Sequence, residues 1–445
     1  MNLVVRPGHP LRGVISLPGD KSISHRAALL AAIAKGESRI GNFLRAGVTN
    51  PMLEALTCLG VAWKLENSTL IVQGNGLEGL KPASKPIECG NSATTVRLLA
   101  GVIAAAGLPA ILDGSEQLRS RPMQRIVEPL EQMGVSIKST QGCIPLTLGE
   151  SCLPLHGITY RLPVASGQVK SCILLAGLSA ENVVNLVEPA ASRDHTERML
   201  ANMGVMINSA TQQTDHGRLY LTVLQPQQPL SLSPLNTVLP GDISSAAFLI
   251  VAALITPDSQ LLIKDVGINP TRRGLLDILI EMGADIRVQA KGNQAGEPVG
   301  NIFVSHSNLM GGRISGELVV RMIDEFPVFG VAAAYARSRS IVSQAKELRY
   351  KESDRIASLS AELVKLGVGL EEAADGFNVL GGGNIQGGQV DSHQDHRLAM
   401  ALAVAGLAAQ APVTVQGAEI ISESFPEFIQ ALKSLGADIT ATEAR

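Results

Sequence analysis

Residues 17–33 read LPGDKSISHRAALLAAI, and residues 239–255 read LPGDISSAAFLIVAALI. Each stretch joins a Pro-Gly turn signal to a capping Asp and a run of small apolar residues, which predicts a turn followed by a helix. The second stretch begins 222 residues after the first in a chain of 445 residues, which is about half its length. The match therefore predicts a duplicated chain with two similar halves.

A shorter pattern repeats inside each half. A helix-like stretch ends in Leu or Met and is followed by Gly, then Val or Ala, then a strand-like alternation, as in ALTCLGVAW and ILIEMGADI. Glycine just past a helix is the usual left-handed cap, so the pattern predicts a helix and then a strand. Successive glycines are 69 to 84 residues apart, which indicates a repeated unit; they are Gly60, Gly134, Gly204, Gly283, Gly367 and Gly436.

Each of the six units also holds an apolar helix of small residues, such as AAFLIVAALI or LAMALAVAGL. A helix that is apolar nearly all round is buried, so helices inside and sheets outside are expected. The sequence therefore predicts an α/β fold of two domains with three units each. One domain spans residues 20–236, and the second joins residues 1–19 to residues 237–445.

The bulk composition narrows the class of protein. Apolar residues make up 45% and charged residues 17%, as in folded proteins, and the net charge of −3 argues against a nucleic-acid partner. The five cysteines lack metal-ligand spacing and are expected to be reduced thiols. The N-terminus lacks a signal-peptide core and no stretch is long enough to span a bilayer, so we expect a cytoplasmic chain without a membrane partner.

Polar groups gather where the buried helices are expected to begin. Cations stand at five of these six starts, although a helix N-terminus normally disfavours them and attracts anions. Their presence implies an anionic ligand that ordinary capping does not explain. On its own, the run ELRYKESDR at 347–355 indicates an ion-paired, solvated helix face. The polar starts include Lys21–Arg26, Gly90–Arg97, Ser166–Lys170, Arg321–Glu325 and Asp395–Arg397.

Taken together, these motifs resemble the EPSP synthase family over essentially the whole chain. The matching strings include KSISHR, GNSATTVRLL, RSRPM, SGQVKS, SRDHTERML, MIDEFP, KESDR and DHRLAM. The resemblance is closer to the glyphosate-tolerant-like branch, which has VKS after its SGQ-type motif. It implies an inside-out α/β barrel of two domains, each of three βαβαββ units. It also implies a monomer that needs no metal or organic cofactor, with the active site in the cleft between the domains.

The resemblance implies a reaction and its residues. The family joins phosphoenolpyruvate to the 5-hydroxyl of shikimate 3-phosphate and releases phosphate. Asp324 and Glu352 are the implied proton-transfer carboxylates, with Lys21 beside them and His396 orienting Glu352. Shikimate 3-phosphate is expected to meet Lys21, Ser22, Arg26, Ser166, Gln168, Arg193, Asp324 and Lys351. Phosphoenolpyruvate is expected to meet Lys21, Ala93, Thr94, Arg121, Gln168, Arg355 and Arg397.

The charges of the implied site agree with two anionic substrates. Two phosphate monoesters and two carboxylates bring roughly five to six negative charges. The seven implied lysines and arginines would balance them, and would repel one another without substrate. This predicts an open, mobile state of the free protein that an anion helps to close.

Two segments depart from the family pattern. Ala93 stands where a glycine is usual, and its methyl group is expected to shorten the pocket for phosphoenolpyruvate. We therefore expect weaker binding of glyphosate, which is longer than that substrate. The segment LRAGVTN at 44–50 replaces one that normally carries acidic residues.

Two other functions stay open at this point. The related enolpyruvyl transferase of UDP-N-acetylglucosamine shares the fold, but it has Lys-Asn near its start and a reactive loop cysteine. Here Lys21 precedes Ser-Ile-Ser-His-Arg, and Cys143 lies in a different context. The altered 44–50 segment is also compatible with a degenerate, non-catalytic anion-binding paralogue. Assays with the two acceptors, and measurement of phosphate release, separate the three hypotheses.

Overall fold

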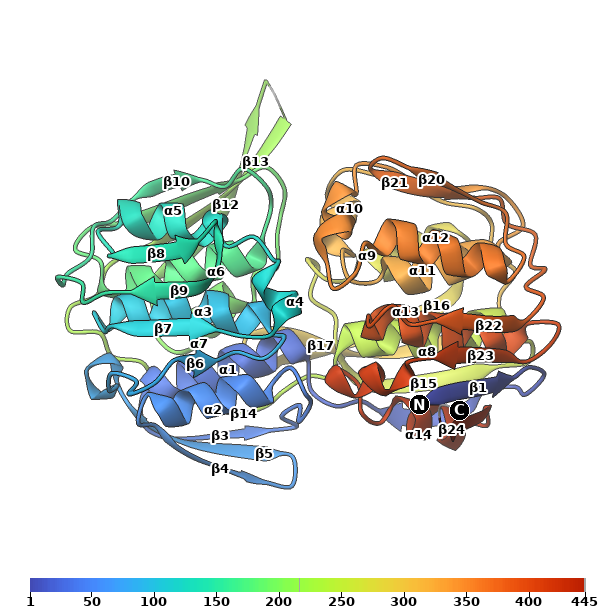
Figure 1. Cartoon of the computed structure of the whole chain (residues 1–445), viewed down its shortest axis with the longest axis horizontal. Helices are drawn as coiled ribbons and strands as arrows, with labels where there is room; N and C mark the ends of the chain where they lie inside the picture. The colour runs from blue at the N-terminus through green and yellow to red at the C-terminus, as the bar shows by residue number, and fades with distance from the viewer. Residues whose placement is uncertain (216, 444–445) are drawn as a thin grey trace. The chain divides into compact units, whose positions relative to one another are not determined.

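The computed structural model describes residues 1–215 and 217–443 (Figure 1). The chain forms two compact units with separate hydrophobic cores. The inserted unit comprises residues 19–239 and 293–297, and the terminal unit comprises residues 1–18, 240–292 and 298–445. Among the described residues, none of the helices has the length and apolar character that a bilayer crossing needs.

Each unit contains three sheets of four strands with one shared pairing pattern. In every sheet one edge strand runs parallel to its neighbour, and that neighbour is antiparallel to the third strand. Six copies of one topology confirm the repeated α/β architecture. The inserted unit has β14 (Asn236–Val238), β3 (Lys35–Gly41), β5 (Thr69–Asn75) and β4 (Ala62–Glu66); β6 (Ile87–Glu88), β7 (Ala110–Asp113), β9 (Cys143–Leu148) and β8 (Ile137–Thr140); and β10 (Thr159–Arg161), β11 (Val184–Glu188), β13 (Gly217–Leu224) and β12 (Ile207–Thr214).

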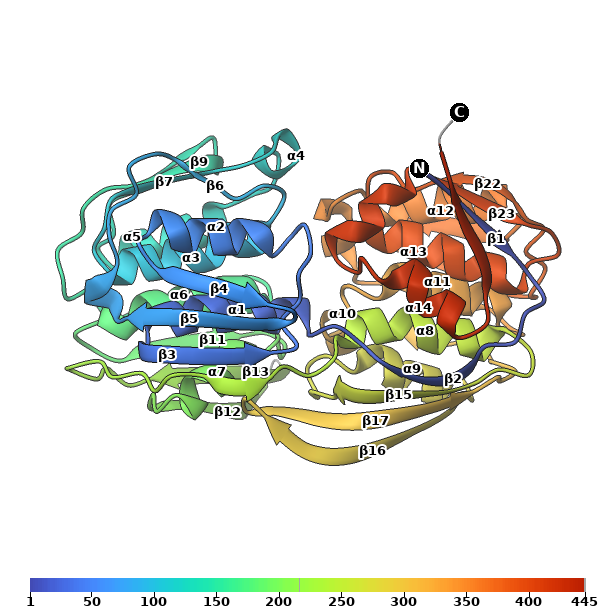
Figure 2. The ribbon, with the colours of Figure 1, turned by 90° about the horizontal axis from the view of Figure 1, so that it is seen from below.

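The terminal unit takes strands from both ends of the chain. Figure 2 shows β1 beside β23 and the C-terminal strand, in agreement with its antiparallel pairing to β23 and β24. The N-terminal residues thus complete sheets that the C-terminal half begins. The three sheets are β16 (Asp285–Gln294), β17 (Glu297–Ser305), β15 (Gln260–Gly267) and β2 (Arg12–Ser16); β18 (Arg313–Ile314), β19 (Ser340–Val342), β21 (Gly376–Val379) and β20 (Leu370–Ala373); and β22 (Gly388–Asp391), β23 (Val413–Gln416), β1 (Asn2–Arg6) and β24 (Asp438–Thr442).

The repeated glycines end six helices. All six have a positive φ, from 80° at Gly60 to 109° at Gly436, which is the left-handed region that suits a residue without a Cβ. A strand follows each of them, so the predicted order of helix, glycine and strand is confirmed. The six helices are α2 (Asn50–Cys58), α5 (Gln124–Gln132), α7 (His195–Asn202), α9 (Gly274–Glu281), α12 (Arg355–Lys365) and α14 (Phe428–Ser434).

The other long helices are the buried ones that the small apolar residues predicted. All thirteen residues of α8 are buried, for example, and α8 packs against α11 and α13 within the core of the terminal unit. Their N-termini carry the polar motifs of the sequence. These helices are α1 (Lys21–Ile33), α3 (Ala93–Ala105) and α6 (Gly167–Ala176) in the inserted unit, and α8 (Ile243–Ile255), α11 (Phe326–Tyr335) and α13 (His396–Ala405) in the terminal unit.

Strand pairing sets the borders of the inserted unit. Its last strand, β14, pairs in parallel with β3, which keeps the chain in this unit as far as Leu239. At the first border Gly19 lies so close to the carbonyl of Asn42 that an added Cβ would sit 1.9 Å from its oxygen, so only glycine fits there. Residues 293–297 also belong to the inserted unit, where Glu297 pairs with the buried His195 ring at 2.7 Å.

Candidate functional site

In the inserted unit, the polar residues of α1, α3 and α6 stand at helix starts whose backbone N–H groups are capped by short side chains. Asp20 caps α1 by accepting from Ile23 N at 2.9 Å. Ser92 caps α3, and Ser166 caps α6. Lys21 and Ser22 therefore occupy the first turn of α1, and Ala93 and Thr94 the first turn of α3. These are positions where the helix dipole attracts an anion.

Gln168 is held between two side chains of α3. Its amide nitrogen donates to Thr94 Oγ1 at 2.8 Å, and its amide oxygen accepts from the Arg97 guanidinium. Arg97 also donates to the carbonyl of Pro122 at 3.0 Å, which fixes the segment that carries Arg121. Arg97 was not among the expected ligands. It acts here by orienting Gln168, a contact that only the packing of α3 on α6 reveals.

Arg26 is buried and joins three helices. Its guanidinium donates to Thr196 Oγ1 at 2.7 Å on α7 and to Ser171 Oγ at 2.8 Å on α6, besides the carbonyl of Ser22. Burial lowers the pKa of Arg26 to about 10, which leaves it cationic near neutral pH. Arg193 lies in the loop before α7, and its backbone packs so tightly on Gly167 that an added Cβ would lie 3.0 Å from the Arg193 carbonyl oxygen.

The unusual 44–50 segment is folded without carboxylates. Thr49 is fully buried, and its hydroxyl group donates to the Leu44 carbonyl at 2.8 Å, which closes the turn. His25 lies beside it, with its ring nitrogens 2.8 Å from the carbonyl oxygens of Lys21 and Val48. The buried side chains of Leu44 and Ala46, together with the Thr49 hydroxyl group, hold the segment in a defined place against α1.

His25 should make the inserted unit sensitive to acid. Its burial lowers its pKa from 6.5 to about 4, so the folded state favours the neutral ring. The resulting stability is present above pH 6.5 and is lost as the pH falls toward 4. Between pH 7 and pH 4.5, we expect the free energy of unfolding of a His25→Gln variant to fall by about 2–3 kcal/mol less than that of the wild type.

Urea denaturation followed by Trp63 fluorescence measures this effect. Trp63 is the single tryptophan of the chain and lies on β4 of the inserted unit. Equal losses in the two proteins would contradict the assignment of the acid sensitivity to His25.

In the terminal unit, Arg355 is the centre of a second cluster. It is 2% exposed and opens α12. Its Nε donates to Asp395 Oδ2 at 2.8 Å, and its Nη2 donates to Glu352 Oε2 at 2.7 Å. Burial alone would raise the pKa of Asp395, but the Arg355 guanidinium outweighs it and holds that pKa below its usual value. Asp395 also caps α13, so one carboxylate joins the starts of two helices.

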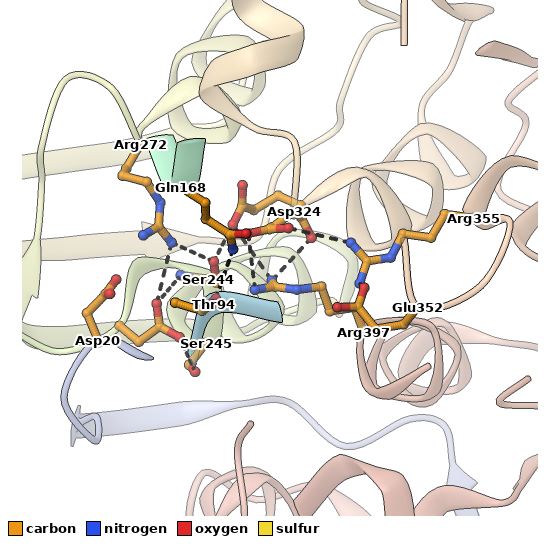
Figure 3. Close-up of polar contacts among 12 residues, drawn as sticks. Asp20, Thr94, Gln168, Ser244, Ser245, Arg272, Asp324, Glu352, Arg355 and Arg397 are labelled. Carbon is orange, nitrogen blue, oxygen red and sulfur yellow. Dashed lines mark hydrogen bonds and ion pairs between the residues drawn. The ribbon is translucent and has the colours of Figure 1, made fainter. Parts of the chain in front are cut away.

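Arg397 and Asp324 complete this cluster. Arg397 Nη1 donates to the Asp324 carbonyl at 3.2 Å, and its Nη2 lies 3.5 Å from Asp324 Oδ2. Figure 3 shows the guanidinium groups of Arg355 and Arg397 both directed toward Asp324. The next residue, Glu325, is buried and lies 3.8 Å from Arg397.

A buried polar chain supports Glu325 from behind. Ser244, in the first turn of α8, donates to the Glu325 carboxylate. It also accepts from Arg272 at 2.8 Å (Figure 3). Arg272 was not among the residues expected at the site. It belongs to the PTRRG stretch that follows β15, and its side chain is buried. The sequence alone does not distinguish a buried arginine from an exposed one.

Two expectations about charge need correction. Mutual repulsion is wrong for Arg355 and Arg397, because each already pairs with carboxylates of its own unit. The run 347–355 is also not a solvated helix face. Residues Lys346–Tyr350 form a short 3₁₀ helix with Leu348 buried, and α12 begins only at Arg355.

The structure thus gathers the expected residues into two clusters. The terminal-unit cluster consists of Asp324, Lys351, Glu352, Arg355, Asp395, His396 and Arg397, on or beside the starts of α11, α12 and α13. The inserted-unit cluster lies on or beside the starts of α1, α3, α6 and α7, with Arg121 just before α5. It consists of Lys21, Ser22, Arg26, Ala93, Thr94, Arg121, Ser166, Gln168 and Arg193.

Known proteins resemble this chain in sequence and in fold. Residues 5–432 match the family model described as EPSP synthase (3-phosphoshikimate 1-carboxyvinyltransferase). A 3-phosphoshikimate 1-carboxyvinyltransferase of Geobacter metallireducens is 44% identical, over 97% of this chain and 99% of its own. The EPSP synthase structure from Acinetobacter baumannii superposes with a TM-score of 0.86 at 37% identity and covers 99% of this chain and all of its own. The enolpyruvyl transferase NikO from Streptomyces tendae, at 19% identity and a TM-score of 0.76, covers 100% of this chain and 99% of its own and shares the fold.

Proposed function

Because the chain belongs to the EPSP synthase family, we propose that it transfers the enolpyruvyl group of phosphoenolpyruvate to the 5-hydroxyl of shikimate 3-phosphate. The observation that carries the proposal is the terminal-unit cluster, where Glu352 and Asp324 both face the buried guanidinium of Arg355. Two carboxylates beside a fixed cation suit proton transfer on an anionic substrate. The product belongs to the shikimate pathway of aromatic amino-acid biosynthesis.

The two clusters serve the same reaction in this proposal. Shikimate 3-phosphate binds Lys21, Ser22, Arg26, Ser166, Gln168 and Arg193 of the inserted unit, with Asp324 and Lys351 of the terminal unit. Phosphoenolpyruvate binds Arg355 and Arg397 of the terminal unit, with Lys21, Ala93, Thr94, Arg121 and Gln168 of the inserted unit. Helix N-termini supply further N–H donors for the phosphate and carboxylate oxygens.

The proposed chemistry gives each of the two carboxylates a role. Asp324 accepts the proton of the 5-hydroxyl as its oxygen attacks C2 of phosphoenolpyruvate, while Glu352 delivers a proton to C3. The resulting tetrahedral ketal phosphate then loses phosphate, which takes up the proton held by Asp324, and Glu352 takes a C3 proton back, so both carboxyl groups return to their starting states. Lysine and arginine side chains stabilise the charge on the departing phosphate.

The surplus of carboxylates explains how Glu352 comes to act as an acid. Four of them, from Asp324, Glu325, Glu352 and Asp395, surround the guanidinium groups of Arg355 and Arg397. A carboxylate paired with a guanidinium is stabilised in its charged form. In the proposed mechanism the carboxylate of phosphoenolpyruvate takes over part of Arg355, so Glu352 loses its partner and accepts a proton.

Phosphate release is the direct test. The purified protein is incubated with phosphoenolpyruvate and either shikimate 3-phosphate or UDP-N-acetylglucosamine, and free phosphate is measured. We expect release with shikimate 3-phosphate only. Release with the nucleotide sugar alone would replace the proposal, and binding of both proposed substrates without any release would indicate a non-catalytic paralogue.

We further propose tolerance to glyphosate, supported by Ala93. This residue is the first of α3 and is 3% exposed, and the helix backbone fixes the direction of its methyl group. One additional methyl group in a pocket changes the affinity for a ligand by about 10- to 200-fold. We expect Ala93→Gly to lower the inhibition constant of glyphosate by a factor in this range, with a smaller change in the KM for phosphoenolpyruvate. A submicromolar inhibition constant for the unaltered protein at low phosphoenolpyruvate would refute it.

The setting of the reaction is also a proposal. We infer a cytoplasmic monomer that acts on small molecules, because its proposed substrates are metabolites and both clusters come from a single chain. Sedimentation analysis of the purified protein with and without substrates tests the oligomeric state. A dimer that persists at micromolar concentration would argue against the monomer.

A further inference from the structure

A buried ion cluster lies behind the inserted-unit residues that are proposed to bind substrate. Lys170, one turn into α6, is 3% exposed. Its ammonium group donates to Glu188 Oε2 at 2.7 Å, at the end of β11, and pairs with Glu197 Oε1 at 2.8 Å, in the first turn of α7. It also lies 3.5 Å from the Ser192 carbonyl oxygen. One side chain thus joins a helix, a strand end, a loop and a second helix.

The carboxylates of this cluster depend on Lys170. Glu188 and Glu197 are both buried, and neither Glu188 Oε1 nor Glu197 Oε2 receives a hydrogen bond within residues 1–215 and 217–443. Burial raises the pKa of Glu197, and Lys170 acts against that shift. Two buried carboxylates with so few donors stay in place only while a cation neutralises them.

The same cluster borders the residues assigned to shikimate 3-phosphate. The 189–194 loop, held at its Ser192 carbonyl, carries Arg193. Thr196, next to Glu197 on α7, accepts from Arg26 at 2.7 Å. Gln168 is oriented independently, because its partners Thr94 and Arg97 both lie on α3. Lys170 is therefore placed to affect Arg26 and Arg193 more than Gln168.

We propose that Lys170 is a positioning residue for the acceptor: by neutralising Glu188 and Glu197 it fixes the 189–194 loop and α7, and thereby sets Arg193 and Arg26 for shikimate 3-phosphate. This role rests on the proposed function. Lys170 itself is buried behind the site and touches no substrate in this scheme.

The test compares substitutions that differ in charge and reach. Lys170→Met removes the ammonium group. Lys170→Met/Glu188→Gln also breaks the tie but removes one charge of each sign, so the protein keeps its net charge. Lys170→Arg keeps a cation at the same place. Lys138→Met is the matched control, because Lys138 lies exposed on β8 of the same unit.

Calorimetry with shikimate 3-phosphate and steady-state kinetics give the readouts. We expect the dissociation constant for shikimate 3-phosphate to rise about 10- to 100-fold in the single Met variant and in the double variant, as for a displaced binding residue. The kcat and the KM for phosphoenolpyruvate at saturating acceptor should change much less. Lys170→Arg should recover most of the affinity, and Lys138→Met should match the wild type.

Each other outcome overturns the role. Wild-type affinity in the double variant would show that only the net charge mattered, and this variant decides alone if Lys170→Met does not fold. A loss of kcat with unchanged acceptor affinity would also refute the role. If the wild type turns over and the Lys170 variants bind shikimate 3-phosphate as tightly as it does, only the role of Lys170 is overturned. If the wild-type protein neither binds shikimate 3-phosphate nor releases phosphate, the proposed function is overturned as well.

Discussion

A Glu352→Gln variant should lose activity by about 10²- to 10⁴-fold in kcat, because an amide neither delivers nor accepts the proton at C3. The substitution keeps the size of the side chain and an oxygen that can accept from Arg355, which now donates to Glu352 at 2.7 Å. The fold and the binding of shikimate 3-phosphate should therefore survive. Steady-state kinetics at saturating substrates measure the loss, with circular dichroism to confirm the fold.

Asp324→Asn provides the companion measurement. We expect a loss of the same order, because the 5-hydroxyl then lacks its base. Glu281→Gln is the control, since Glu281 is an exposed residue at the end of α9 in the same unit. A near-normal kcat in either site variant removes the proton-transfer role from that residue and leaves the role of the other standing.

The second large effect concerns stability. Arg355→Met should destabilise the terminal unit by about 3–5 kcal/mol, because it leaves the fully buried Asp395 carboxylate without its cation. Asp395 would then keep uncharged hydrogen-bond donors, such as the backbone N–H of Arg397 at 2.9 Å. Arg355→Met/Asp395→Asn should regain part of this loss, since no uncompensated buried charge of Asp395 then remains.

Two spectroscopic signals locate this effect. Trp63 is the single tryptophan and reports on the inserted unit, whereas far-ultraviolet circular dichroism reports on both units. In urea, the Arg355→Met variant should lose part of its dichroism at lower denaturant, while the fluorescence midpoint moves less. An unchanged dichroism midpoint, or a double variant no more stable than the single one, would contradict the account of Asp395 as a buried charge that needs Arg355.

Much of the architecture was predictable because it follows from local rules that recur. Gly60 and its five counterparts take the left-handed conformation that the sequence pattern predicts, since a residue with a Cβ is strained there. The uniformly apolar helices had to be buried for the same kind of local reason. Each such pattern is weak evidence by itself, but it occurs six times and each occurrence predicts the same structure.

The pairing of charges was not predictable from local rules. The Lys170 contact with Glu188 spans 18 residues of sequence, and that of Arg355 with Asp395 spans 40. Side chains so far apart in sequence meet only after the helices have packed. For this reason the sequence predicted cations that pair only with an anionic ligand, whereas Arg355 already pairs with carboxylates of the folded chain. Nothing local in the sequence marks residues 293–297 as part of the inserted unit, because they form the tip of the hairpin between β16 and β17, with its turn at Ala295 and Gly296.

The placement of β1 and β2 also dictates an order of events during translation. β1 pairs with β23 and β24, which the ribosome makes long after β1, while residues 19–239 of the inserted unit emerge much earlier than those two strands. At about 5–20 residues per second, the first strands wait on the order of half a minute for their partners. The nascent chain thus carries unpaired, β-prone strands after residues 19–239 have already left the ribosome. During that interval the solubility of the nascent chain depends on its cellular surroundings, because the contacts of these strands in the native fold have not yet formed.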